Sequence, residues 1–155
     1  MNILIAAVGK VKKEHKMLLD EYLKRLKAFA ALNITEVAEE KLNDSDAASI
    51  KKAVEAESKR LSEACSGYYK IVLTPEGREV SSEEFSQVLS KVKMGSSKVA
   101  FIVGGSYGLS DSLKKQADKC ISFSRMTYPH ALFRIMLLEQ IYRAFKIEAG
   151  HTYHK

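Results

Sequence analysis

The segment that decides the fold is KVAFIVGGSYGLSDSLKKQADKCISF, residues 98–123. It opens with an apolar run, Lys98 to Val103, that predicts a buried strand and ends in Gly104-Gly105. A short helix is expected after Ser110-Asp111, because such side chains accept hydrogen bonds from the first free backbone N–H groups of a helix. Cys120 to Phe123 is a second apolar run. The order strand, helix, strand predicts two parallel strands joined by a crossover.

The same alternation extends to both ends of the chain. Apolar runs predict strands at Asn2 to Val8, Asn33 to Ala38 and Tyr68 to Leu73, and helical spacing predicts helices at Lys13 to Ala30, Asp46 to Cys65 and Ser81 to Met94. Pro129 predicts the start of a last helix, since proline is tolerated at the first helical position. The sequence therefore predicts one α/β domain, residues 1–155, with a parallel-rich sheet and helices on both of its faces.

Two local signals refine this pattern. Pro75-Glu76-Gly77 predicts a turn after the third strand, because proline presets the first dihedral angle of a turn and glycine relieves the next. Ser81 and Glu84 have the spacing of a capping box, and Gly95 is expected to end the helix that they open.

Composition narrows the class of protein. With 155 residues and a hydrophobic content of 46%, the chain has the size of one domain and can bury a core. The net charge of +6 favours a polyanionic partner, although many basic enzymes bind no nucleic acid. The two cysteines lack the paired spacing of a zinc site, so no metal is expected. The basic residues of MNILIAAVGKVKK follow its apolar run, the wrong order for a secretion signal, and no segment resembles a membrane span, so we expect a cytoplasmic location.

The expected binding site lies where the strands end, because open parallel sheets usually bind ligands at the carboxyl ends of their strands. The residues after Leu73, Val103 and Phe123 are therefore the candidates. Gly104 to Gly108 would let a ligand approach the backbone closely, but an ordinary tight turn fits equally, since the spacing matches no phosphate-binding fingerprint. Ser124 to His130 delivers several hydrogen-bonding groups into a helix start, as ligand loops and capped helices both do.

The last helix places charged residues among apolar ones. Arg134 lies against the apolar stripe, where an arginine usually pairs with a carboxylate or meets an anion. Glu139 and Arg143 are four residues apart and fit an ordinary helix ion pair. His130 fits a helix-start histidine with satisfied hydrogen bonds as well as a functional group. The tail His151 to Lys155 holds two histidines, but a metal site would need a third ligand.

Taken together, these motifs resemble one known family. The stretches that carry the resemblance are NILIAAVGK from Asn2, FIVGGSYGL from Phe101, SFSRMTYPHALFRIMLLEQIYRAFKI from Ser122, and the closing Tyr153-His154-Lys155. They resemble the ribosomal RNA large subunit methyltransferase H family (RlmH) of the SPOUT superfamily, and the resemblance covers essentially the whole chain.

The resemblance implies a fold and an activity that periodicity alone would not suggest. The implied fold is a SPOUT α/β knot, whose C-terminal segment is threaded into a trefoil knot. The implied assembly is a homodimer packed through the last helix, Pro129 to Lys146. The implied reaction transfers a methyl group from S-adenosyl-L-methionine to N3 of a pseudouridine in a stem-loop of the large-subunit (23S) ribosomal RNA, with the assembled ribosome as a plausible substrate.

The resemblance also implies the residues of the site. The cofactor would be held by the three loops at the strand ends, with Leu73 and Leu132 as apolar neighbours of the adenine; the implied cofactor residues are Leu73, Thr74, Gly104, Gly105, Phe123, Ser124, Arg125, Met126, Thr127, Tyr128 and Leu132. The implied catalytic residues are His130 as a base or hydrogen-bonding partner, Arg134 and Arg143 as phosphate or anion contacts, Tyr142 or Tyr153 as stacking surfaces, and the tail with Tyr153 and His154 as the part that completes the site.

Two other classes of function stay open on the residues alone. A basic RNA-binding or ribosome-associated module would use the same surface without turnover and would bind no cofactor. A flavodoxin-type protein would cradle the phosphate of FMN or a mononucleotide in Gly104 to Gly108, above the helix that Ser110-Asp111 opens.

Overall fold

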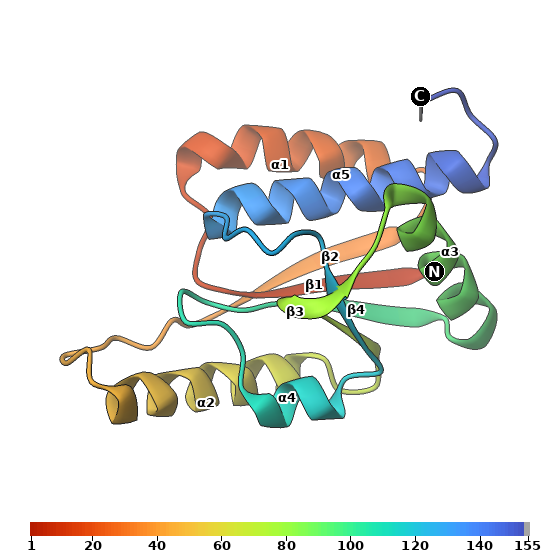
Figure 1. The fold of residues 1–155 in the computed structure, drawn as a ribbon. Coiled ribbons are helices and arrows are strands. Elements are labelled where there is room, and N and C mark those ends of the chain that lie inside the picture. Colours follow the sequence, from red (N-terminus) through yellow and green to blue (C-terminus); the bar gives the residue numbers. More distant parts are fainter. Residues whose placement is uncertain (154–155) are drawn as a thin grey trace.

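The computed structural model describes residues 1–153, which form five strands and five helices in alternation (Figure 1). The strands are β1 (Asn2–Val8), β2 (Ala31–Val37), β3 (Tyr69–Glu79), β4 (Lys98–Val103) and β5 (Lys119–Ser122). The helices are α1 (Lys13–Leu26), α2 (Ala47–Ala64), α3 (Ser82–Gly95), α4 (Asp111–Gln116) and α5 (His130–Glu148). All strand pairs are parallel, in the order β2-β1-β4-β3-β5. The predicted α/β class with a parallel sheet is confirmed.

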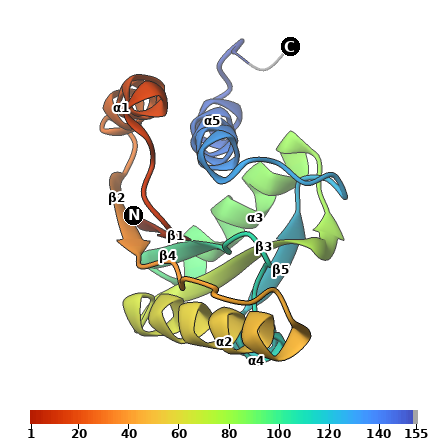
Figure 2. The ribbon, with the colours of Figure 1, turned by 90° about the vertical axis from the view of Figure 1, so that its left-hand side faces the viewer.

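Helices cover both faces of this sheet, as predicted. Figure 2 shows α1, α3 and α5 on one face and α2 and α4 on the other. Alternate residues of each strand therefore point into two different cores. Ile5 and Phe101 belong to the core beneath α1, α3 and α5, whereas Ala6 and Ile102 belong to the core above α2 and α4. Both faces of β1 and β4 are buried, which explains why these strands are continuous apolar runs.

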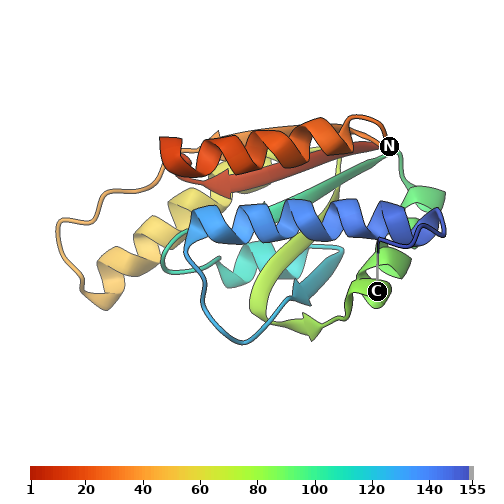
Figure 3. The same ribbon diagram turned by 90° about the horizontal axis from the view of Figure 1, so that it is seen from above.

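Helix α5 is the central helix of its layer. Seen from above in Figure 3, it runs between α1 and α3, and it packs against both. It begins directly after Pro129, as expected, and its buried side chains include Leu137, Leu138 and Ile141. The predicted cap at Ser110 is present, since its side chain accepts a hydrogen bond from a backbone N–H of α4, and Asp46 caps α2 in the same way.

The capping box of α3 is confirmed. The Ser81 hydroxyl accepts from Glu84 N at 3.2 Å, and the Glu84 carboxylate accepts from Ser81 N at 2.9 Å. Two N–H groups that the first helical turn would leave unpaired are satisfied in this way.

The predicted turn at residues 75–77 is wrong, because the structure includes these residues in β3. Ile121 of β5 pairs with Leu73 and again with Arg78, so the intervening residues of β3 form an irregularity in the register. A Cβ added to Gly77 would lie 2.6 Å from the carbonyl carbon of Ile121. The sequence signal marks a real break in the strand, but β5 provides a pairing partner on both sides of the break. The trefoil knot that the resemblance implies stays a prediction.

Candidate functional site

A cavity of about 610 Å³ opens beside the irregular part of β3 and at the ends of β4 and β5. Three segments line it: Leu73 to Glu76 of β3, Val103 to Leu109 after β4, and residues after β5 between Phe123 and Pro129. Lys114 of α4 and His130 and Phe133 of α5 complete the wall. Parallel strands end at the same edge of a sheet, so the fold itself brings these distant loops together. The cavity lies at the edge at which the sequence predicts a ligand.

Most of the predicted cofactor residues line this cavity. Those that do are Leu73, Thr74, Gly104, Gly105, Phe123, Ser124, Met126, Thr127 and Tyr128. Arg125 and Leu132 are not among the lining residues. The side chain of Arg125 is exposed and forms an ion pair with Glu79, with its Nε 3.2 Å from the carboxylate. Leu132 is 43% exposed, and its contact with an adenine stays a prediction.

The turn after β4 needs its glycines for steric reasons. A Cβ on Gly104 would lie 2.9 Å from the carbonyl of Gly108 and from Cγ of Leu109. A Cβ on Gly105 would lie 2.7 Å from a carboxylate oxygen of Glu57. Gly108 has φ +82°, a conformation that residues with a side chain rarely adopt, and its N–H donates to Gly105 O at 3.1 Å. The result is a tight turn that presents bare backbone to the cavity.

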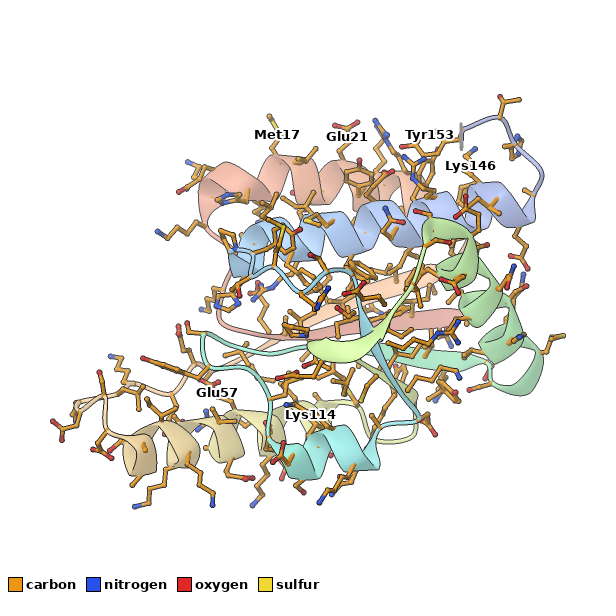
Figure 4. All side chains as sticks on the ribbon, in the orientation of Figure 1. Met17, Glu21, Glu57, Lys114, Lys146 and Tyr153 are labelled. Atoms are coloured by element: carbon orange, nitrogen blue, oxygen red, sulfur yellow. The ribbon has the colours of Figure 1, made fainter. Side chains whose placement is uncertain are left out.

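Helix α2 supports this turn from behind with two adjacent buried polar residues. The Ser58 hydroxyl accepts from Ser110 N at 2.9 Å, and Glu57 Oε1 accepts from Glu40 N at 2.8 Å. Figure 4 shows Glu57 on the side of α2 that faces the sheet. Burial raises the pKa of Glu57, and the nearby carboxylate of Glu39 raises it further. Sequence reasoning missed this support, because Glu57 and Ser58 look like ordinary polar residues of a charged helix.

The loop after β5 combines a polar backbone with an aromatic wall. Ser124 Oγ accepts from Met126 N at 3.0 Å, and Ser122 Oγ donates to Ser124 O at 3.0 Å. The ring of Phe133 lies with its centroid 5.5 Å from that of Phe123 and 6.4 Å from that of Tyr128. Flat apolar surface beside hydrogen-bonding groups is the usual composition of a site for a small heterocyclic ligand.

His130 lies in the cavity, as predicted. Its Nε2 is 3.3 Å from the Ser106 hydroxyl, so the first residue of α5 meets the glycine turn of β4. The hydrogen can come from either partner, depending on the tautomer of the imidazole. This contact leaves the histidine beside the space in which a ligand would lie.

Arg134 is not open to a phosphate, contrary to one expectation for it. Its side chain is 1% exposed, and its Nη1 donates to Glu36 Oε1 at 2.9 Å. Its Nη2 donates to the carbonyl oxygens of Val8 at 2.5 Å and Gly9 at 2.8 Å. Burial lowers the pKa of Arg134, and the Glu36 carboxylate opposes that effect. The other expectation for Arg134, pairing with a carboxylate, is met by Glu36. Through these contacts the guanidinium connects α5 to the ends of β1 and β2.

Arg143 and Tyr153 lie far from the cavity, at the other end of α5. The Glu139 carboxylate accepts from Arg143 Nη2 at 2.6 Å, and this contact is the expected helix ion pair. The same carboxylate accepts from the Tyr153 hydroxyl at 3.0 Å. Burial, and then the hydrogen bond to Glu139, raises the pKa of Tyr153. At about 1.5 Å of rise per residue, Arg143 is roughly 20 Å along the helix from His130. His154 lies outside the described residues.

Comparison with known proteins identifies this arrangement. A sequence profile described as "Predicted SPOUT methyltransferase" matches residues 1–154. Two curated proteins named Ribosomal RNA large subunit methyltransferase H, from Clostridium botulinum (strain Kyoto / Type A2) and Clostridium kluyveri (strain ATCC 8527), are each 45% identical to the chain, and each alignment covers 100% of both sequences. The chain belongs to the SPOUT methyltransferase family. Its predicted membership of the methyltransferase H group within that family is confirmed.

Solved structures support the fold of this SPOUT methyltransferase. A probable methylase family protein from Haemophilus influenzae superposes with a TM-score of 0.56 at 13% identity, over 99% of this chain and 70% of that chain. A ribosomal RNA small subunit methyltransferase E from Neisseria gonorrhoeae, bound to S-adenosyl methionine, superposes with a TM-score of 0.50 at 13% identity, over 96% of this chain and 67% of that chain. At such identities the likeness concerns the fold alone.

Two charged residues of the SPOUT methyltransferase cavity were missed by sequence reasoning. Lys114 Nζ lies 3.6 Å from Glu76 Oε2, and the Thr74 hydroxyl donates to the same carboxylate. That hydrogen bond is the main cause that lowers the pKa of Glu76. Glu76 falls in the predicted turn, and the local sequence assigns Lys114 no role, so only the fold shows that they meet.

Residues 1–153 contain neither a cluster of metal-binding side chains nor a helix suited to a membrane. No group of three or more histidine, cysteine, aspartate or glutamate side chains in this part of the chain could hold a metal ion. None of the described helices has the length and apolar content needed to cross a membrane.

Proposed function

We propose that this protein is an S-adenosyl-L-methionine-dependent methyltransferase that methylates N3 of a pseudouridine in the 23S ribosomal RNA of the large subunit. The observation that carries the proposal is full-length identity of 45% with proteins named for large-subunit ribosomal RNA methylation. The functional unit is one domain, residues 1–155, and its location is the cytoplasm, where its substrate would be found.

The cavity has the size and the chemistry that the cofactor requires. Its volume of about 610 Å³ suits a ligand of this size. Gly104 and Gly105 line the cavity with backbone that a ribose can approach closely, and the Phe123, Tyr128 and Phe133 rings offer a flat wall for the adenine. When bound, S-adenosyl-L-methionine supplies a methyl group activated by a positively charged sulfur. The residues proposed to hold it are the loop residues that line the cavity.

The remaining chemistry belongs to the protein. N3 of a pseudouridine carries an imide proton that must leave before the nitrogen can be methylated. His130 lies in the cavity, with Nε2 within reach of the Ser106 hydroxyl, and can accept that proton or hydrogen-bond the developing anion. Tyr128 and Tyr107 offer aromatic surfaces at the cavity on which a base could stack.

The substrate surface requires a second copy of the chain. The family resemblance assigns Arg143 and Tyr153 to the site, yet Arg143 lies roughly 20 Å along α5 from His130, and Tyr153 is hydrogen-bonded to Glu139 on the same helix. They can act there only across a homodimer interface. The net charge of +6 favours an RNA partner, and the proposed substrate surface is one built by the dimer that binds an assembled ribosomal surface.

Calorimetric titration with S-adenosyl-L-methionine is the first test, with FMN and ATP as controls. We expect binding of S-adenosyl-L-methionine alone; a preference for FMN would instead indicate the flavodoxin-type alternative. The second test is transfer of a labelled methyl group to 23S RNA in ribosomes that lack the modification, followed by mapping of the methylated nucleotide. Cofactor binding without any methyl transfer to ribosomes or free RNA would contradict the proposed substrate.

A further inference from the structure

The cavity contains a paired acid and base that none of the roles above uses. Among its lining residues, Glu76 is the acidic side chain and Lys114 the strongly basic one. Glu76 belongs to the irregular part of β3, and Lys114 belongs to α4, on the opposite face of the sheet from α5. Figure 4 shows Lys114 on the side of α4 that faces β3. The pair therefore closes one side of the cavity, away from the loop after β5.

The two groups keep hydrogen-bonding capacity for a ligand. Their separation of 3.6 Å exceeds the 2.7–3.2 Å range of an ordinary N–H···O bond, and the next carboxylate, Asp111, is 3.8 Å from the same ammonium. An ammonium has three donors, and a carboxylate accepts about four hydrogen bonds. The Thr74 hydroxyl holds Glu76 in its ionised form by lowering its pKa. Both residues line the cavity; the Lys114 side chain is 24% exposed and the Glu76 side chain 70% exposed, so the ammonium is the more enclosed partner of the pair.

The chemistry of the cofactor indicates what would bind there. The amino-acid end of S-adenosyl-L-methionine carries an ammonium and a carboxylate on one carbon atom. The adenine and ribose are neutral and the sulfur is positive, so that carboxylate is the one anionic group that Lys114 could attract. On the protein, a carboxylate lies beside an ammonium. Each can therefore pair with the oppositely charged group of the amino-acid end: the protein ammonium with the ligand carboxylate, and the protein carboxylate with the ligand ammonium.

We propose that Lys114 and Glu76 form the subsite for the amino-acid end of the cofactor, with Lys114 binding its carboxylate and Glu76 its ammonium group. This inference rests on the proposed function. It assigns a binding role to two residues outside the three loops of the family motif, and it sets the direction in which the cofactor lies in the cavity. The adenine then occupies the aromatic side, near Phe133, and the amino-acid end the side of α4.

Ligand truncation provides the test. S-adenosylhomocysteine keeps the amino-acid end, whereas 5′-methylthioadenosine lacks it but keeps the adenosine and the sulfur. We expect Lys114→Met to weaken S-adenosylhomocysteine binding about tenfold, as the loss of a partly exposed charged hydrogen bond implies, and to change 5′-methylthioadenosine binding less than about twofold. Glu76→Gln should show the same pattern with a smaller loss, about threefold.

Control variants keep the result interpretable. Lys115→Met removes an exposed lysine from the same helix and should change neither dissociation constant. Lys114→Arg retains the charge and should retain most of the preference for S-adenosylhomocysteine. Calorimetry supplies the dissociation constants, and thermal unfolding shows whether each variant is folded.

Three results would overturn the inference. If Lys114→Met weakens both ligands equally, the lysine shapes the cavity and does not bind the amino-acid end. If both affinities stay unchanged while binding of ribosomal RNA weakens, Lys114 contacts a phosphate. If the wild-type protein binds neither S-adenosyl-L-methionine nor S-adenosylhomocysteine, the proposed function itself fails, and the subsite fails with it.

Discussion

At the scale of single residues, the guanidinium of Arg134 links more of the site's scaffold than any residue in the cavity. It joins α5 to the carbonyl groups that end β1 and to Glu36 of β2, and Glu36 also accepts from Val11 N at 2.9 Å. Because His130 lies one helical turn before Arg134, this anchor also fixes the histidine. Arg134 therefore acts as a positioning residue, through the helix that it holds.

Loss of the Arg134 contacts should lower the stability of the protein markedly. We expect Arg134→Ala to lower the free energy of unfolding by about 3 kcal/mol, because it leaves two carbonyl groups and a partly buried carboxylate without their partner. Arg134→Lys should recover part of the loss. Arg78→Ala is the matched control, since its ion pair with Glu84 is exposed and should contribute less than about 1 kcal/mol. Urea unfolding at neutral pH measures all three; equal losses for Arg134→Ala and Arg78→Ala would contradict the anchor.

Burial of Glu57 should make the stability of the protein depend on pH. Burial raises the pKa of Glu57 above the ordinary value of 4.5, and the Glu39 carboxylate acts in the same direction, whereas the hydrogen bond from Glu40 N and the charge of Arg60 oppose the rise. The stability that Glu57 contributes is therefore complete below pH 4.5 and is lost as the pH rises through the raised pKa. Glu57→Gln can still accept the hydrogen bond from Glu40 N and does not ionise. The Tm of this variant, relative to wild type, should rise between pH 4.5 and pH 7.5.

The control for Glu57 is an exposed glutamate of the same helix, Glu55. Glu55→Gln should give a Tm difference from wild type that hardly changes with pH. If the Glu57→Gln curve is equally flat, burial does not raise the pKa of this carboxyl enough to influence stability.

These residues also show how far a sequence can predict a site. Gly104, Thr127 and His130 were predictable, because each follows directly from a strand end or a helix start that the local pattern marks. The partner of Arg134 was not, since Glu36 is 98 residues away along the chain and only the packing of α5 brings the two together. The same holds for Glu76 and Lys114: nothing in either local sequence indicates the other.

At the scale of elements, the break in β3 leads to a test of how closely this strand must approach β5. The chain passes so near β5 that Gly77 has no room for a Cβ against Ile121. We expect Gly77→Ala to lower the free energy of unfolding by about 2 kcal/mol or more, because the obstructing atoms of Ile121 and Cys120 belong to the backbone and cannot rotate away. Gly95→Ala is the control: it lies at the end of α3, has nothing within 4 Å of the added Cβ, and should be neutral or slightly stabilising. A Gly77→Ala protein as stable as Gly95→Ala would show that β3 can move away from β5.

Whether a segment forms a helix or a strand was predictable where the hydrophobic pattern was strong. The residues at which these elements begin and end were harder to predict. The predicted helix at 13–30 ends at Leu26, because the residues after it form a turn that leads into β2. The turn signal at Pro75 to Gly77 was overridden by pairing with β5, a strand more than forty positions later in the sequence. The strand order β2-β1-β4-β3-β5 could not be predicted either, since local patterns carry no information about which strands become neighbours.

At the scale of the whole molecule, α5 separates the proposed catalytic residues. It crosses the full length of its layer in Figure 3. His130 is its first residue and lines the cavity, whereas Glu139 and Arg143 come later in the helix and Tyr153 is hydrogen-bonded to Glu139. The outer surface beside it is partly apolar: Met17 of α1 is 83% exposed and Leu18 is 45% exposed, and Figure 4 shows Met17 directed away from the sheet. Such a surface suits a second copy of the chain, which could bring its own Arg143 and Tyr153 toward the cavity.

A shared site of this kind predicts complementation between two inactive variants. His130→Ala disables the cavity of its own chain, and Arg143→Ala disables the contribution to the cavity of the partner. Each variant alone should lose most methyl transfer to ribosomes. In a random mixture of the two chains, half of the dimers are mixed, and each mixed dimer holds one site with both wild-type residues. About a quarter of wild-type activity should therefore return when the variants are co-expressed or refolded together. If both residues served the cavity of their own chain, no mixed dimer would hold an intact site, and the mixture would stay as inactive as its components.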